Sequence, residues 1–415
     1  MRAYFKTWMS IPFSALVFAC GSSDGSSQVA APKDTITGSG TGGSEGSTVV
    51  AGSSTVGSGG PGSDVGTSAG TGSTSGGLAP GTSGVTTGGG ATAGAGGSGG
   101  GGGSSGADDA GASPPPVIQS GILTAGVWDD NRNISRFMGY RSTLQAEQLP
   151  GLLPIADADY AAAHDASLVA PGPRTTLDIS FVIDTTGSMG DEIAYLKSEF
   201  LAISNTLKNN YPNAAPRWSL VVYRDVGDEY LVRSFDFSFD AQVFQNNLAA
   251  QNANGGGDFP ESPERGLGAM AQFAWRTDAA TARIAFWVAD APHHVQNASA
   301  MAAAIGQARA QGIHIYPVAS SGVDEFTELT MRTAAQMTLG RYLFLTNDSG
   351  IGGPHKEPSI PCYFVTKLDS AILRMVDIEL TGAYREPAPA EIIRTGGNPQ
   401  NGACKLDSGA EVIVF

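Results

Sequence analysis

A segment of very low complexity sets the strongest limit on how this chain can fold. From Gly21 to about Pro116 the sequence is almost entirely Gly, Ser, Thr and Ala, with scattered Asp and Pro and almost no large apolar residue. Such a segment cannot bury enough surface to offset the entropy lost on ordering. We therefore expect residues 20–116 to be a disordered linker, which at about 95 residues would span roughly 50–60 Å as a Gly-rich coil.

The overall charge excludes one class of partner. The chain has 415 residues and a formal net charge of -15. The sequence contains no dense stripe of Lys and Arg. An acidic chain without such a stripe is a poor match for the phosphates of DNA or RNA. We expect no nucleic-acid partner.

The first twenty residues have the pattern of an export signal. Two basic residues precede an apolar stretch at residues 8–19, which is too short to span a bilayer. The stretch ends in "LVFAC", which resembles the lipobox of bacterial lipoproteins, with Cys20 as the lipidated residue. The resemblance implies a signal peptide at 1–19. Because Gly21 follows Cys20, it also implies anchoring in the outer membrane, on either the periplasmic face or the cell surface. The alternative is ordinary cleavage after Ala19.

The cysteine count favours a disulfide. The chain has 3 Cys, and an odd number in an exported protein leaves one thiol to explain. If Cys20 carries lipid, Cys362 and Cys404 remain and can pair in an oxidising compartment. The alternative is two unpaired buried thiols. We favour the disulfide, because neither Cys has neighbours at zinc-binding spacing. The bridge would pin a small β appendage at 382–415.

Beyond residue 173, short apolar runs alternate with helical patterns. The helix after Ser188 places apolar residues on one face, namely Ile193, Leu196, Phe200, Ile203 and Leu207. Strands are predicted at 177–183, 217–224, 282–290, 313–319 and 341–346, with an edge strand in "YLVRSFDFSFD". Further helices are predicted at 241–251, 261–275, 298–311, 323–339 and 365–380. This alternation predicts an α/β fold with a doubly wound, mostly parallel sheet. Residues 117–173 are predicted to be a lead-in segment, irregular at 143–173.

Carboxylates and hydroxyls cluster where two of the predicted strands end. Asp184 ends one buried strand, Thr186 and Ser188 follow it at alternate positions, and Asp290 ends another strand. Ligands of such sheets bind at the C-terminal ends of the strands. A glycine-rich loop between them, "GGGDFPE", adds Asp258. Oxygen donors of this kind, without Cys or His, are the ligand set of a hard cation such as Mg²⁺, Mn²⁺ or Ca²⁺.

The sequence at Asp184–Ser188 matches the D-x-[ST]-x-S motif of the von Willebrand factor type A (VWA) domain. That motif opens the family's metal-ion-dependent adhesion site. The resemblance places a VWA domain at 174–381 and implies that Thr186 and Ser188 bind the metal through their hydroxyls. It also implies that Asp184 and Asp290 act largely through bound waters. The family's second-loop ligand is usually Thr, and the matching loop here offers Asp258. Mg²⁺ is the expected ion, with Ca²⁺ or Mn²⁺ as alternatives.

Several neighbouring residues have simpler interpretations. His293 and His294 flank the site and could reach the ion, although such residues more often line a loop. We interpret Arg224, Asp225 and Asp228 as a structural turn with an ion pair.

Together these features predict a tethered binding module and not an enzyme. Neutral hydroxyl ligands leave the charge of the ion uncancelled, so an acidic residue of a protein partner could complete its shell. No nucleophile–base pair, phosphate-binding loop or zinc motif occurs in the sequence. Two alternatives stay open: a domain whose metal is only structural, and a metal-dependent phosphoryl hydrolase, suggested by "DTTG". The membrane is an expected partner only through the lipid anchor.

Overall fold

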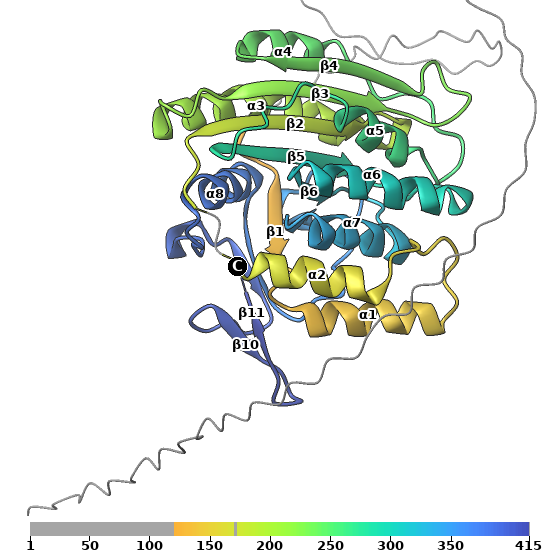
Figure 1. Cartoon of the computed structure of the whole chain (residues 1–415), viewed down its shortest axis with the longest axis vertical. Helices are drawn as coiled ribbons and strands as arrows, with labels where there is room; N and C mark the ends of the chain where they lie inside the picture. Colours follow the sequence, from red (N-terminus) through yellow and green to blue (C-terminus); the bar gives the residue numbers. More distant parts are fainter. Residues whose placement is uncertain (1–119, 170–171, 415) are drawn as a thin grey trace, which may run out of the picture. The chain divides into compact units, whose positions relative to one another are not determined.

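The structure is a computed structural model that describes residues 120–169 and 172–414. The predicted signal peptide, Cys20 and the linker at 20–116 lie outside the described residues. Within the described part of the chain, nine strands form one mixed sheet with helices on both faces (Figure 1). None of the helices in this part is long and apolar enough to cross a membrane. The predicted α/β architecture is confirmed.

The sheet has a parallel centre and antiparallel flanks. Strands β3, β2, β5, β6 and β7 run parallel, while β4 pairs antiparallel with β3 at one edge. Strand β1 pairs antiparallel with both β7 and β8, and β9 pairs antiparallel with β8 at the other edge. In sheet order the strands are β4 Val232–Ser238, β3 Arg217–Tyr223, β2 Thr176–Asp184, β5 Thr281–Ala289, β6 His314–Ala319, β7 Tyr342–Leu345, β1 Thr124–Trp128, β8 Tyr363–Lys367 and β9 Arg394–Gly396.

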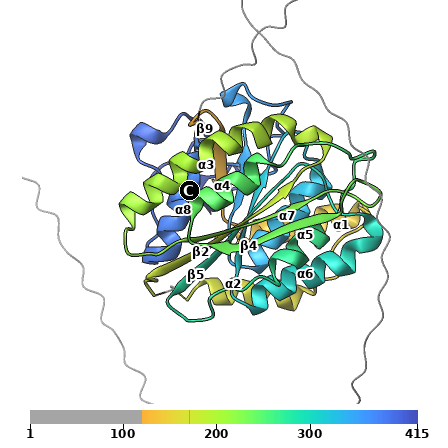
Figure 2. The ribbon, with the colours of Figure 1, turned by 90° about the horizontal axis from the view of Figure 1, so that it is seen from above.

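Helices cover the two faces of the sheet as separate layers (Figure 2). One layer contains α1 Ile134–Ala146, α2 Asp157–Ser167, α5 Pro263–Met270, α6 Ala298–Ala310 and α7 Glu325–Met337. The other contains α3 Gly190–Asn210, α4 Ala241–Ala249 and α8 Leu368–Thr381. Strand β2 contributes to the cores on both faces: Val182 packs in the layer that contains α5, and Phe181 packs in the layer that contains α3. Because successive side chains of an inner strand pack into opposite layers, both faces are buried and the strand sequence is mostly apolar.

The helix predicted after Ser188 is confirmed as α3. Its predicted apolar face is buried against the sheet in full, namely Ile193, Leu196, Phe200, Ile203 and Leu207. The aromatic rings of Phe200 and Phe244 on α4 lie 4.1 Å apart between centroids, so α3 and α4 share one core. The N-terminus of α3 is thereby fixed directly after the loop that carries Thr186 and Ser188.

Three local predictions are wrong. The segment predicted to be irregular at 143–173 contains the end of α1 and all of α2. The helix predicted from 365 begins at Leu368, since Tyr363–Lys367 form β8. The helix predicted at 261–275 is shorter, at Pro263–Met270. The sheet also extends past 174–381, because β1 lies before this range and β9 after it.

The turn after β1 is held by a buried ion pair. Arg332 on α7 donates to both carboxylate oxygens of Asp130, at 2.7 and 3.0 Å. The same guanidinium donates to Glu328 at 3.0 Å. Trp128 at the end of β1 donates its indole N–H to Asp130 at 2.9 Å. These contacts fasten the segment at 120–133 to α7 and make it part of the domain.

The C-terminal strands β10 Ala403–Lys405 and β11 Glu411–Ile413 form a separate two-stranded sheet. A disulfide joins Cys404 in β10 to Cys362, directly before β8, with the Cα atoms 6.3 Å apart. The predicted pairing and the small disulfide-linked β unit are confirmed.

Reduction of this disulfide is expected to destabilise the protein. The bridge closes a loop with a sequence separation of 42 residues. In the chain-entropy model such a loop is worth about 4 kcal/mol in the free energy of unfolding. Urea unfolding with and without a reductant measures the change, and Cys362→Ala/Cys404→Ala should match the reduced parent. Equal unfolding midpoints in both redox states would contradict the expectation.

Candidate metal site

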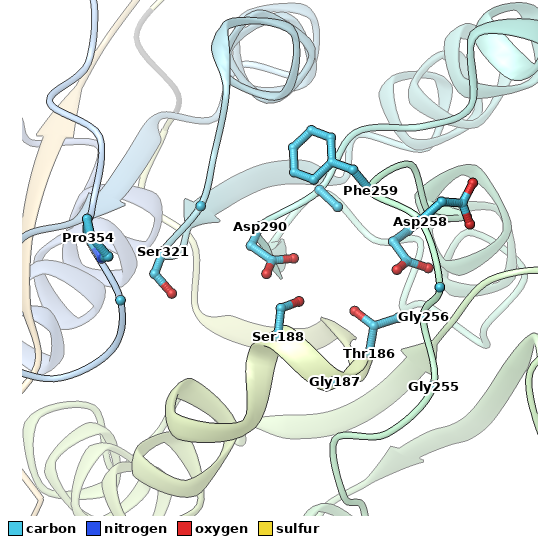
Figure 3. Close-up of a pocket in the computed structure, with 15 residues that line it drawn as sticks. Thr186, Gly187, Ser188, Gly255, Gly256, Asp258, Phe259, Asp290, Ser321 and Pro354 are labelled. Carbon is cyan, nitrogen blue, oxygen red and sulfur yellow. The ribbon is translucent and has the colours of Figure 1, made fainter.

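The strand ends bring the predicted site residues together. Strands β2 and β5 are parallel neighbours, and Ile183 pairs with Val288. Asp184 ends β2, and Asp290 directly follows β5, so both lie at the same edge of the sheet. A pocket of about 590 Å³ opens there, and Thr186, Ser188, Asp258 and Asp290 are among its lining residues (Figure 3).

Asp184 is fully buried and does not itself line the pocket, but it is hydrogen-bonded to Thr186, which does. Thr186 donates its backbone N–H and its hydroxyl to Oδ1 of Asp184, at 2.9 and 2.7 Å. The other oxygen, Oδ2, has no partner at normal hydrogen-bond distance, although the Tyr223 hydroxyl acts on this carboxyl group and lowers its pKa. Burial and then the charge of Asp290 raise the pKa of Asp184 to about 7. The environment therefore resists a free carboxylate here, unless a cation accompanies it.

Asp290 is likewise a buried carboxylate with an unpartnered oxygen. It is only 4% exposed, and its Oδ1 has no hydrogen-bond partner. Burial raises the pKa of Asp290, and a hydrogen bond from Ser188 opposes that shift. Figure 3 shows the side chains of Ser188 and Asp290 facing each other across the pocket. Ser188 itself is exposed, so its hydroxyl is open to the pocket and to solvent.

The glycine-rich loop is fixed to the first loop by backbone hydrogen bonds. Gly187 donates to the carbonyl of Gly255 at 3.1 Å, and Asn254 donates to that of Thr185 at 3.0 Å. Gly256 adopts a left-handed φ of 69° and passes close to Thr186. A side chain at Gly256 would come within 2.9 Å of Oε1 of Glu261 and 3.2 Å of Cβ of Thr186. A glycine therefore lets the second loop approach the site closely.

The second loop contributes a buried carboxylate that sequence reasoning missed, Glu261. It is 3% exposed, lines the pocket, and has no hydrogen-bond partner for Oε2. Burial, and then the charges of Asp184, Asp225 and other carboxylates, raise the pKa of Glu261 to about 9. The sequence feature that could have identified Glu261 is its position directly before Ser262 and Pro263, where α5 begins.

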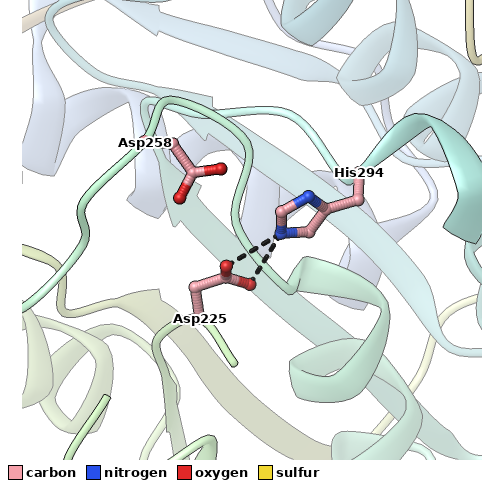
Figure 4. A group of neighbouring side chains, drawn as sticks. All are labelled: Asp225, Asp258 and His294. Atoms are coloured by element: carbon pink, nitrogen blue, oxygen red, sulfur yellow. Dashed lines mark hydrogen bonds and ion pairs between the residues drawn. The ribbon is translucent and has the colours of Figure 1, made fainter. Parts of the chain in front are cut away.

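The predicted ligand Asp258 also lines the pocket. It is exposed at the rim of the pocket. Its carboxylate belongs to a group with Asp225 and His294, whose potential ligand atoms all lie within 4.8 Å of one another (Figure 4). His294 contacts both carboxylate oxygens of Asp225, at 2.8 and 2.9 Å. These three residues form a second group that could hold a metal ion.

The remaining residues near the site have structural partners. His293 is fully buried, and its Nε2 lies 3.0 Å from the carbonyl oxygen of Gly151. Burial lowers the pKa of His293 to about 4, so its ring is neutral at neutral pH. The predicted turn after β3 is present, because Asp225 donates its backbone N–H to Asp228. The acidic partner of Arg224 is Glu229, at 3.5 Å, and not either aspartate.

The donor set of the pocket fits a divalent cation. Three buried carboxylate oxygens lack partners: Asp184 Oδ2, Asp290 Oδ1 and Glu261 Oε2. In the described part of the chain, no ion pair involves any of these three residues. Uncompensated buried carboxylates are costly, and a hard cation with oxygen ligands would compensate them. The hydroxyls of Thr186 and Ser188 add two neutral donors of the same kind.

Comparisons with known proteins found a sequence relative, two solved structures and a family model. The chain is 28% identical over 119 residues to the alpha-protein kinase vwkA of Dictyostelium discoideum, over 28% of this chain and 19% of that protein. Two crystal structures of the pilus adhesin SpaC from Lactobacillus rhamnosus GG, one in an open conformation, match with TM-scores of 0.31 and 0.30. Their sequence identities are 12% and 13%, and the matches cover 40% of this chain and 28% and 27% of the adhesin. The chain thus spans less than a third of each relative. A family model of the von Willebrand factor A domain matches residues 178–350, and the chain therefore contains a VWA domain.

Proposed function

We propose that this VWA domain binds a protein partner through a divalent cation, with Mg²⁺ as the preferred ion. The observation that carries the proposal is the pocket in which Asp290 and Glu261, each with a buried unpartnered carboxylate oxygen, meet the hydroxyl residues Thr186 and Ser188, with Asp184 buried next to Thr186. Asp184, Thr186, Ser188 and Asp290 would hold the ion directly or through water. A cation held there would supply an open position for a carboxylate oxygen of the partner.

The second loop would supply the fifth ligand, and the geometry favours Glu261 over Asp258. Glu261 is buried within the pocket and has a free carboxylate oxygen, whereas Asp258 is exposed beside Asp225 and His294. A Glu in place of the family's usual Thr adds one negative charge to the ligands of the ion. We therefore expect a higher affinity for the cation than at a site with Thr. We also expect the bound cation to attract an external carboxylate more weakly.

Ser188→Ala tests the proposal. Because Ser188 is exposed, its removal should leave the fold intact while taking away one oxygen donor. At a Mg²⁺ concentration of about 100 times Kd, binding stabilises the parent by about 2.7 kcal/mol. We expect Mg²⁺ to raise the melting temperature of the parent and of Ser188→Thr, which keeps the hydroxyl, but to raise that of Ser188→Ala far less. An equal rise in Ser188→Ala, or no rise in the parent, would argue against the site.

We also propose that the protein is exported and lipid-anchored at Cys20, and that it acts in binding and not in catalysis. The motif "LVFAC" after a short apolar stretch supports the anchor. Cys20→Ser should move the protein from the membrane fraction to the soluble fraction and leave its precursor uncleaved. Fractionation followed by mass measurement checks both effects. Unchanged membrane association in the variant would rule out the lipid anchor.

A further inference from the structure

The group formed by Asp225, Asp258 and His294 lies beside the pocket on three different loops. Asp225 follows β3, Asp258 lies in the glycine-rich loop, and His294 follows β5. Figure 4 shows the carboxylate of Asp258 directed at the Asp225–His294 pair. The Ser188 loop contributes no member to this group, so the three residues can be separated from the first site by mutation.

Neighbouring residues hold Asp225 in place. Ser262 donates its hydroxyl to Oδ1 of Asp225 at 2.7 Å. Arg224 is fastened to the carbonyls of Thr185 and Asn252, at 3.0 and 2.8 Å. Asp225 is 8% exposed. One ligand of the group is thus pre-positioned, as a metal site requires.

The unpartnered carboxylate of Glu261 lies beside this group as well. The next residue, Ser262, contacts Asp225, and the backbone N–H of Glu261 donates at 2.8 Å to Pro292, two residues before His294. The backbone of Glu261 is therefore held between the loops of Asp225 and His294, and its Oε1 and Thr186 both lie close to Gly256. Glu261 is 3% exposed, and its free Oε2 has no counter-charge. The charge of Asp225 acts on Glu261, so a second cation held by the group would offset negative charge on both carboxylates.

The distances suit a small metal ion. In tetrahedral coordination two ligand atoms that each lie about 2.1 Å from the ion are about 3.4 Å apart. The ligand atoms here all lie within 4.8 Å of one another, and those of Asp225 and His294 are 2.8 and 2.9 Å apart. One ion therefore needs a small opening of that pair and an inward shift of Asp258. Asp258 is exposed and can supply that shift.

We propose that Asp225, Asp258 and His294 form a second cation site, which selects a transition metal of the Zn²⁺ type. An imidazole nitrogen together with carboxylates favours such ions over Mg²⁺ and Ca²⁺, which prefer oxygen alone. The two sites would then hold chemically different ions next to each other. The second site does not depend on occupation of the first.

Zn²⁺ titration of the metal-depleted full-length chain tests this proposal. Calorimetry is run in excess Mg²⁺, which occupies the oxygen site. We expect the parent to bind Zn²⁺, and His294→Gln and Asp258→Asn each to weaken that binding about 10-fold or more. Asp258 is exposed, so its variant remains informative even if His294→Gln fails to fold. Co²⁺ in place of Zn²⁺ adds a visible absorption band, which His294→Gln should lose.

Two control variants separate this site from the rest of the chain. His164→Gln changes a partly exposed histidine on α2, outside the group, and should bind Zn²⁺ like the parent. Ser188→Ala disables only the first site and should also keep Zn²⁺ binding. Loss of Zn²⁺ binding in Ser188→Ala with retention in His294→Gln would place the ion in the first site and overturn the proposal. Parent-like binding in both His294→Gln and Asp258→Asn would overturn it equally.

Discussion

Arg332→Met is expected to lower the free energy of unfolding by about 3–5 kcal/mol, the usual cost of breaking a buried ion pair from one side. Arg332 is 1% exposed and is the guanidinium partner of both Asp130 and Glu328. Without it Glu328 keeps its ion pair with Lys356 at 2.8 Å, whereas Asp130 keeps the indole N–H of Trp128 and no ion pair within the described residues. An uncompensated carboxylate would then remain in the core, which is the source of the loss.

Two comparisons make this result specific. Arg233→Met breaks an exposed pair with Glu229 and should cost less than about 1 kcal/mol. Arg332→Met/Asp130→Leu removes both charges and should recover a large part of the lost stability. Urea unfolding of the variants gives all the values. If Arg332→Met were no less stable than Arg233→Met, the Asp130–Arg332 pair would not be what holds the segment at 120–133 to α7.

The parallel centre of the sheet could be predicted because its strands are buried on both sides. Strands β2, β3, β5 and β6 are segments of six to nine residues that are rich in apolar residues, and such segments have few other interpretations. The flanking strands carry weaker signals. Strand β1 is five residues that include a glycine, and β9 is three. Their place in the sheet depends on pairing with distant strands, which local periodicity cannot report.

The site was predictable in position but only partly in composition. Asp184, Thr186, Ser188 and Asp290 follow strand ends, so the direction of the chain fixes where they lie. The second loop offers two carboxylates three residues apart, Asp258 and Glu261. Which of them turns inward depends on the left-handed glycines at 255 and 256 and on the hydrogen bond from Glu261 to Pro292. These are tertiary features, and the spacing of the motif does not contain them.

The pairing of Asp225 with His294 was hidden for a similar reason. They are 69 residues apart in the sequence and meet because each follows a strand of the parallel sheet. The sequence around Asp225 predicts a local turn, and that turn is present. The turn accounts for the backbone of Asp225, whereas its side chain contacts a different loop.

The metal-free protein is expected to lose stability as the pH rises from about 5 to about 9, with Glu261 as a main cause. The pKa of Glu261 is about 9 in the folded protein, against an ordinary value of 4.5. Between these values the folded state holds a proton that the unfolded state has released. The free energy of unfolding therefore falls as the pH rises through this window. Each unit of pKa difference corresponds to about 1.4 kcal/mol, so the expected loss amounts to several kcal/mol.

Glu261→Gln should flatten this pH profile, because glutamine keeps the shape of the side chain and carries no titrating proton. In EDTA at pH 8 the variant should be more stable than the parent. In Mg²⁺ the order should reverse, since the parent gains a cation that needs the carboxylate and the variant has lost that ligand. Melting temperatures across pH 5–9, with EDTA and with Mg²⁺, measure both effects. Asp258→Asn is the matched control: it removes an exposed carboxylate from the same loop and should leave the EDTA profile unchanged. If Asp258→Asn flattened the profile and abolished the response to Mg²⁺ while Glu261→Gln did neither, the second-loop ligand would be Asp258.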